Sequence, residues 1–301
     1  MATKSRSSSN KNRKKNSSRR SPGLLWPIIA LGITGAVAAL LYLLPLPPGT
    51  GPEVRPPFEE FDSAPPVSHL SKPSRPKGTT SMPLVAILID DMGYNLRMNN
   101  AFLKLEAPLS FSFLPAAPHT PKLASRAKDL GKDVLIHLPL EPVNSAIDPG
   151  PGVLRLGMDL DSMLQILRKD LDAVPGAIGV NNHMGSKFTT SKRGMELILT
   201  EIKHRGLFFV DSKTTHDSIA YVTARSMGIP AAERAVFLDH DTQKESIRRE
   251  IKKMMKLSMA NGYALAIGHP TSNTWKVLYE ELPRVRKRVR IVPVHKILVS
   301  Q

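Results

Sequence analysis

From residue 84 onward, short apolar runs alternate with longer amphipathic stretches, and no other feature constrains the fold as strongly. Runs rich in β-branched and aromatic residues predict strands, whereas apolar residues spaced three or four apart predict helices. The predicted strands are Leu84–Ile89, Leu109–Leu114, Val134–Leu138, Ala177–Val180, Leu207–Val210, Ala235–Leu238, Tyr263–Ile267 and Arg290–Val294. The clearest predicted helices are Asp159–Ala173, Ser191–Arg205, Thr242–Asn261 and Thr271–Val285. Because such strands pair in parallel, we predict an α/β fold: a distorted or incomplete (β/α) barrel of 7–8 mostly parallel strands.

Several classes of chemistry lack their sequence signatures. The chain contains no GxGxxG or P-loop pattern, so neither dinucleotide nor ATP chemistry is indicated. It has no Gly-x-Ser-x-Gly elbow, which disfavours a serine hydrolase. Cysteine is absent, which excludes disulfides, thiolate metal ligands and a cysteine nucleophile.

The residues before this domain divide into three segments by composition. Residues 1–23 hold eight Lys or Arg and no acid, so they account for half of the formal net charge of +16. Residues 24–44 carry no charge, and about 20 such residues span a bilayer. Residues 45–82 are rich in Pro, Ser and Gly, which predicts a flexible linker that reaches up to roughly 100 Å when extended. The predicted catalytic domain then occupies residues 83–301.

The basic and apolar segments together predict where the domain is located. By the positive-inside rule, residues 1–23 form a cytoplasmic tail and residues 24–44 a single transmembrane helix. We therefore expect a protein of the bacterial inner membrane with a periplasmic or otherwise extracytoplasmic domain. A cleaved signal peptide is the alternative, although the apolar run is long for one.

Polar residues repeatedly follow the predicted strands. In parallel α/β folds, chemistry collects at the carboxyl ends of strands. The residues found there are Asp90, Asp91, His137, Asn182, His183, Asp211, Asp239, His240, Asp241 and His269. Each alone has an ordinary interpretation: a histidine in an apolar strand is more often a core residue, and Asp241 is expected to cap the helix that follows it.

Taken together, an aspartate and two histidines form a ligand set of oxygen and nitrogen atoms. Such a set suits a catalytic divalent metal such as Zn²⁺, which activates water for hydrolysis. A separate carboxylate and histidine could then serve as base and acid. The carboxylates Asp90, Glu141 and Asp211 could alternatively cleave a glycosidic bond, but the histidines would then have no purpose.

Five stretches of the domain resemble the divergent polysaccharide deacetylase family. They are Ile87–Tyr94, Ile136–Pro142, Asn182–Ser186, Phe209–Thr214 and Ile267–Pro270, and they occur in the same order as in the family. The resemblance implies a distorted (β/α) barrel, a divalent metal, and removal of acetyl groups from an acetylated polysaccharide or other envelope glycan by metal-activated water.

The resemblance also implies roles for individual residues. Asp90 becomes the base, Asp91 a metal ligand and His269 the general acid, with Asp211 as the group that orients His269. The broader deacetylases place two metal-binding histidines four residues apart, whereas the matching positions here are His137 and Glu141. We therefore expect the metal ligands to be Asp91, His137 and His183, with Glu141 as the alternative third ligand. Glu141, Asn182 and Ser186 are expected to bind substrate.

Two other functions remain open at this stage: a catalytically inactive glycan-binding envelope protein on the same scaffold, and another metal-dependent hydrolase such as a phosphoesterase or amidase. No nucleic-acid partner is expected. The basic run at residues 284–290 is more consistent with a solvated helix end, or with contact to anionic polymers or lipid headgroups.

Overall fold

The computed structural model describes residues 82–298. The predicted cytoplasmic tail, the predicted transmembrane helix and all of the predicted linker except Met82 lie outside these residues. Between residues 82 and 298, no helix combines the length and apolarity needed to cross a membrane.

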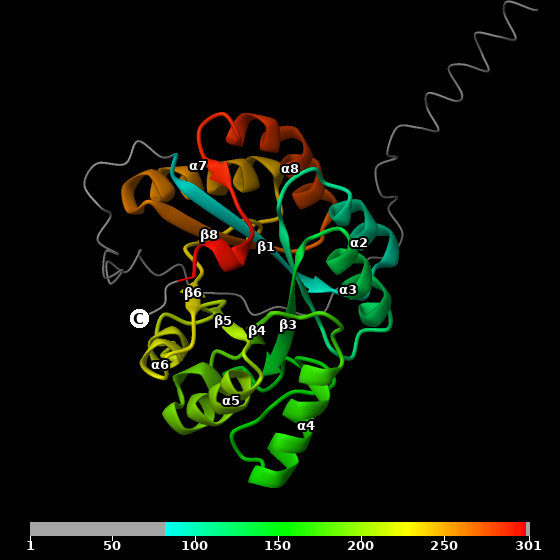
Figure 1. Cartoon of the computed structure of the whole chain (residues 1–301), viewed down its shortest axis with the longest axis vertical. Helices are drawn as coiled ribbons and strands as arrows, with labels where there is room; N and C mark the ends of the chain where they lie inside the picture. Colours follow the sequence, from blue (N-terminus) through cyan, green and yellow to red (C-terminus); the bar gives the residue numbers. More distant parts are fainter. Residues whose placement is uncertain (1–81, 299–301) are drawn as a thin grey trace, which may run out of the picture. The chain divides into compact units, whose positions relative to one another are not determined.

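The core of the domain is a curled sheet in which every pair of strands is parallel (Figure 1). Its nine strands are β1 (Leu84–Met92), β2 (Ser110–Phe113), β3 (Asp133–Leu140), β4 (Gly179–Met184), β5 (Phe208–Asp211), β6 (Ala231–Glu233), β7 (Val236–Phe237), β8 (Tyr263–Gly268) and β9 (Arg290–Ile291). The strand order is β6-β5-β4-β3-β2-β1-β8-β7, and β9 adds to β1. The ends β6 and β7 do not pair, so the barrel is incomplete, as predicted.

Helices connect most of these strands and lie outside the curled sheet (Figure 1). They are α2 (Leu96–Leu103), α3 (Thr120–Asp129), α4 (Leu160–Asp172), α5 (Lys192–His204), α6 (Ala220–Ser226), α7 (Lys244–Asn261) and α8 (Ser272–Val285), with short 3-10 turns η1 (Phe188–Thr190) and η2 (Val294–Lys296). Side chains of Asp159, Ser191 and Thr271 cap α4, α5 and α8 by accepting a backbone N–H in the first turn. Gly262, at φ +87°, ends α7 in the left-handed conformation that glycine tolerates.

Two differences from the sequence-based prediction have simple causes. Strand β6 was not predicted, because its residues Ala231–Glu233 include no β-branched or aromatic side chain. The last predicted strand, Arg290–Val294, is shorter than expected: only Arg290–Ile291 pairs with β1, and Val294 begins η2.

Side chains alternate between the two faces of the sheet, as strand geometry requires. Outward residues such as Val85, Ile87 and Phe209 join the large cluster beneath the helices. Inward residues such as Leu88 and Leu265 fill the barrel interior, together with residues of the C-terminal segment Val292–Ile297. The inward face becomes polar at the carboxyl ends of the strands, and the candidate site lies there.

Candidate metal centre

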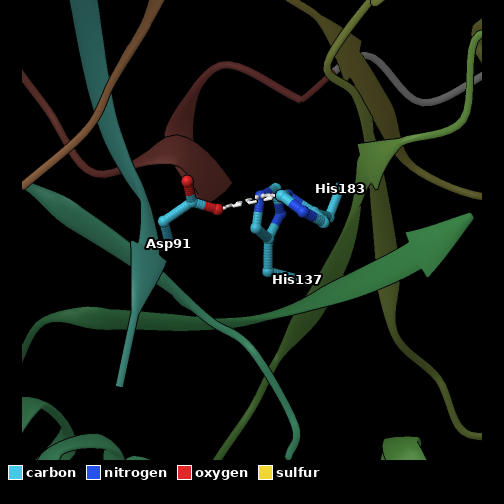
Figure 2. Close-up of side chains that lie close together, drawn as sticks. All are labelled: Asp91, His137 and His183. Atoms are coloured by element: carbon cyan, nitrogen blue, oxygen red, sulfur yellow. Dashed lines mark hydrogen bonds and ion pairs between the residues drawn. The ribbon is translucent and has the colours of Figure 1, made fainter. Parts of the chain in front are cut away.

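Three side chains converge at the carboxyl ends of β1, β3 and β4 (Figure 2). Asp91 Oδ1 lies 3.2 Å from His137 Nε2 and 3.1 Å from His183 Nδ1. The two imidazole nitrogens are themselves 3.2 Å apart. All three residues are buried. The structure thus brings together the three residues predicted as metal ligands.

The arrangement of these three atoms fits a divalent cation. In a tetrahedral site with ligand distances of about 2.1 Å, neighbouring ligand atoms are about 3.4 Å apart, close to the separations seen here. Oδ1 of Asp91 is buried and has no hydrogen-bond partner within the described part of the chain, even though two ring nitrogens approach it. A buried acceptor in this state is costly unless something compensates it, and a cation held by the three atoms would do so. One carboxylate and two imidazoles are donors typical of a catalytic zinc-type site.

Unusual backbone conformations cluster at the same edge of the barrel. Three non-glycine residues have positive φ: Asp91 (54°), Met184 (52°) and Lys213 (48°). They lie at or just after the ends of β1, β4 and β5. The left-handed conformation at Asp91 interrupts the strand alternation, so that Asp90 and Asp91 both contribute to the interior site. Such strain is frequently found at functional sites.

Asp90 is held by an amide that also contacts a metal-ligand candidate. Asn181 Nδ2 donates to both carboxylate oxygens of Asp90, at 3.0 Å each. Its Oδ1 lies 3.1 Å from His137 Nδ1 and accepts a hydrogen bond from Ser112. When His137 Nδ1 donates to this oxygen, its Nε2 presents a lone pair toward Asp91 and His183. Asn181 therefore fixes both the Asp90 carboxylate and the His137 ring.

His269 reaches the site from the end of β8, and Asp239 holds it there. Its Nδ1 lies 3.0 Å from Asp239 Oδ1, and its backbone N–H donates to Asp239 Oδ2 at 2.7 Å. Its Nε2 lies 3.8 Å from Asp91 Oδ2. The ring also meets Phe237 edge-on.

The expectation that Asp211 orients His269 is therefore corrected: Asp239 has that position. Asp211 follows Phe209 on the outward face of β5, because alternation places both side chains on the helix side of the sheet. Its carboxylate accepts hydrogen bonds from Ser218 Oγ and from the backbone N–H groups of Lys213 and Tyr221. Asp211 thus orders the loop before α6 and does not contact His269.

Asp241 accepts a hydrogen bond from Gln243 N just before α7, close to its expected capping position.

The three residues expected to bind substrate make local contacts. Glu141, the alternative ligand, accepts from Leu156 N at 2.8 Å and pairs with Lys187, so its carboxylate is outside the three-atom cluster. Both ends of the Asn182 amide serve backbone groups, at Ser212 N and Met184 O. Ser186 Oγ accepts from Val143 N at 2.9 Å and is partly exposed.

Burial and neighbouring charges shift the pKa values of Asp90 and Asp91 in opposite directions. Burial raises the pKa of Asp90, against the opposing effect of His137 and His269. Burial also opposes ionisation of Asp91, but the adjacent His183 and His137 hold its pKa well below the usual range. Although burial alone would lower it, the pKa of His269 is raised to about 9, chiefly by Asp239. Two neighbouring carboxyl groups with pKa values pushed apart are typical of acid–base sites.

Comparison with known proteins places this site in a family. The family model for the divergent polysaccharide deacetylases matches residues 87–298, which include every residue of the site. The chain belongs to the divergent polysaccharide deacetylase family. Among proteins of similar sequence, an uncharacterized protein of Haemophilus influenzae is 35% identical over 208 residues, covering 69% of this chain and 74% of that protein. The uncharacterized protein YibQ of Escherichia coli is 34% identical over 214 residues, covering 71% of this chain and 67% of YibQ.

A solved structure supports the fold of this family member. An uncharacterized protein from Agrobacterium tumefaciens matches with a TM-score of 0.69 at 22% identity, over 74% of this chain and 92% of that one. The likeness shows that the curled parallel α/β half-barrel occurs in both proteins.

Sequence reasoning missed Asn181 and left Asp239 without a role. Asn181 was passed over beside Asn182 and His183, although strand alternation places Asn181 on the same face as His183. That period-two pattern was the signal available in the sequence. Asp239 follows a strand of only two residues, too short for any pattern to fix its direction.

Proposed function

We propose that this protein is a metal-dependent hydrolase that removes acetyl groups from an envelope or extracellular glycan. The observation that carries the proposal is the buried cluster of Asp91, His137 and His183, with Asp90 and His269 each touching one of its members. Asp90 lies on the His137 side and His269 on the Asp91 side, so a base and an acid are available at different positions around one reacting centre.

The cation held by these three residues, a zinc-type ion by the chemistry of the donors, would polarise the acetyl carbonyl and acidify a water molecule. Asp90 accepts a proton from the attacking water, with its carboxylate held by Asn181. His269 gives a proton to the leaving nitrogen or oxygen of the sugar as the bond to the acetyl carbon breaks. The products are acetate and a free amine or hydroxyl on the glycan.

The location of the reaction is part of the proposal. We infer that residues 24–44 anchor the chain in the bacterial inner membrane, that residues 1–23 stay in the cytoplasm, and that the domain from residue 83 works outside it. A reporter fused after residue 301 tests this topology. Activity of an export-dependent reporter such as alkaline phosphatase is expected, and activity of a cytoplasm-dependent reporter would contradict it.

The first experiment measures metal content by elemental analysis of the full chain, purified in detergent without chelators. About one equivalent of a divalent ion and release of acetate from an N-acetylated glycan are expected. Bound metal without acetate release from any acetylated glycan would point to another metal-dependent hydrolase. Absence of metal after reconstitution would favour glycan binding without catalysis.

Two neighbouring aspartates separate metal binding from proton transfer. Asp91→Ala removes one of three ligands, so metal content is expected to fall to near zero while the circular-dichroism spectrum stays the same. Asp90→Asn keeps a side chain of the same shape but cannot accept a proton, so metal is expected to remain and acetate release to fall at least about 100-fold. Full activity of Asp90→Asn would overturn the assignment of the base.

A further inference from the structure

The end of the barrel opposite the metal centre carries a concentration of positive charge. From the end of α8 to the end of η2 the chain contains no acidic residue. We call the exposed cations of this segment the basic face: Arg286, Lys287, Arg288, Arg290 and Lys296. None of these side chains forms an ion pair with another residue in the range 82–298. Neighbouring Arg284, in contrast, pairs with Glu281.

Helix capping does not account for the charge of the basic face. Cations in the last turn of a helix complement its dipole, but the effect fades within that turn. Helix α8 ends at Val285, so Lys287, Arg288 and Arg290 lie beyond it. The charge also extends to a second element: Lys132 lies just before β3, where burial and then the nearby charge of Arg286 lower its pKa.

Exposed apolar side chains gather at the same end of the barrel. Because all strands are parallel, the residues that precede them lie at one end. Four of the eight large exposed hydrophobic side chains between residues 82 and 298 are found there: Met82 before β1, Leu130 before β3, Ile178 before β4 and Met259 before β8. A surface that combines cations with exposed apolar groups is typical of proteins that bind a membrane interface. Exposed acids at this end include Glu106, Asp129 and Asp172, of which Asp172 is paired with Arg205.

The start of the described chain lies at this end as well. The backbone N–H of Arg290 donates to Pro83 O at 2.9 Å, and Arg290 pairs with Leu84 across β9 and β1. In Figure 1 the red C-terminal segment runs beside the start of β1. The first described residues therefore lie beside the basic face.

We propose that the basic face docks on an anionic lipid surface, which turns the metal centre away from the bilayer. Each cation near an anionic bilayer strengthens attraction, and the exposed apolar side chains can enter the headgroup region. The linker between residue 44 and the domain is long enough on its own to leave the orientation free. The docked face would restrict that freedom and present the site to glycans outside the membrane. The proposal rests on the membrane location proposed above, and the experiment separates the two.

Because the chain has no cysteine, a single fluorophore can be attached at a chosen position. We would label two full-length variants separately. Leu130→Cys places the fluorophore at the end of the barrel that carries the basic face. Val143→Cys places it just beyond the carboxyl end of β3, at a residue that is 71% exposed. The chains are reconstituted into vesicles with a quencher on the lipid headgroup, either neutral or containing phosphatidylglycerol. In anionic vesicles, quenching at residue 130 is expected to exceed quenching at residue 143 by at least about threefold, and the excess should shrink at about 1 M salt.

Charge reversal supplies the matched control. Arg286→Glu, Lys287→Glu and Arg288→Glu together should abolish the excess quenching at residue 130. Lys122→Glu, Lys192→Glu and Arg193→Glu make the same charge change near the N-termini of α3 and α5, at the opposite end, and should preserve it. Equal quenching at both labels in anionic vesicles would overturn the proposal. If a soluble polyanion shields the label at residue 130 and the lipid headgroups do not quench it, the basic face binds an anionic polymer instead.

Extraction of the same vesicles with carbonate tests the anchor separately. Chains that stay with neutral vesicles after extraction retain the anchor whatever the labels report. If the chain is released from neutral vesicles yet shows salt-sensitive quenching on anionic ones, the proposed anchor is wrong and the proposed docking of the basic face stands.

Discussion

At the scale of single residues, Asn181 contacts both the proposed base, Asp90, and a candidate metal ligand, His137. One amide holds the carboxylate of Asp90 through Nδ2 and the ring of His137 through Oδ1. By contrast, Nε2 of His183 is buried without a hydrogen-bond partner among the described residues. Only one of the two candidate histidine ligands is therefore oriented from behind by the protein. Partners of this kind typically change metal affinity by about 10–100-fold when they are removed.

We therefore expect Asn181→Ala to weaken metal binding by about 10–100-fold. Without Oδ1, the His137 ring loses the acceptor that fixes its tautomer, and Asp90 loses a donor at the same time. Competition with a chromophoric zinc chelator measures the affinity without any need for turnover. Asn182→Ala is the neighbouring control, because the Asn182 amide contacts only backbone groups. Equal affinities for wild type and Asn181→Ala would exclude this role of Asn181.

At the scale of elements, the strand ends bring the candidate site residues together, whereas helix α4 behind the sheet buries an ionisable side chain at a cost in stability. Asp170 on α4 is 4% exposed and packs against Gly152, where even a Cβ would lie 2.6 Å from its carboxylate. Burial raises the pKa of Asp170 to about 7, against the opposing effect of Lys169. The unfolded chain releases the Asp170 proton near pH 4, whereas the folded protein keeps it until near pH 7.

Stability should therefore fall as the pH rises through this interval. Below about pH 4 the carboxyl is protonated in both states, and above about pH 7 it is ionised in both, with the full cost present. The shift corresponds to at most about 4 kcal/mol. Asp170→Asn is neutral throughout, so the variant should gain stability relative to the wild-type protein as the pH rises from about 4 to about 7. Urea unfolding at about pH 5 and about pH 8 measures the two free energies of unfolding, and a constant difference between them would show that Asp170 titrates normally.

The elements also show where prediction from sequence succeeds and fails. The eight predicted strands all overlap observed ones, because each carries β-branched or aromatic residues between clear helical patterns. The direction of individual side chains was harder to predict. In β5, Phe208 and Phe209 are both buried, on opposite faces, so the sequence offers no alternation from which to place Asp211. Choosing between Asp211 and Asp239 as the partner of His269 required the three-dimensional structure.

At the scale of the whole molecule, the segment Val292–Ile297 fills the interior of the barrel at the end where the strands begin. Val292, Val294 and Ile297 pack against inward residues of β1 and β8. The backbone and ring of His295 contact Asp133 at the start of β3, which fixes the segment in place. The segment therefore closes the end of the barrel opposite the candidate metal centre and packs against the inward side chains of the strands.

Ile297→Ala should accordingly cost about 2–4 kcal/mol of unfolding free energy, because its side chain is 4% exposed and the space it leaves is enclosed. Val222→Ala serves as the control, since Val222 is 67% exposed and its truncation should change stability by less than about 0.5 kcal/mol. Denaturant unfolding of both variants makes the comparison. A cost below about 1 kcal/mol for Ile297→Ala would mean that the interior is not packed by this segment.

The position of β1 in the sheet has a consequence for how the chain reaches its native state. This first strand pairs with β2 nearby in sequence, but also with β8 and β9, so Leu84 finds its partners at Tyr263 and Arg290. Contacts between such distant parts of a chain close large loops and slow folding. Until β8 arrives, the apolar edge of β1 stays open to pairing with other molecules, which makes it a hazard for aggregation. In the nascent domain this edge is covered only once the residues of β8, near the end of the domain, have been made.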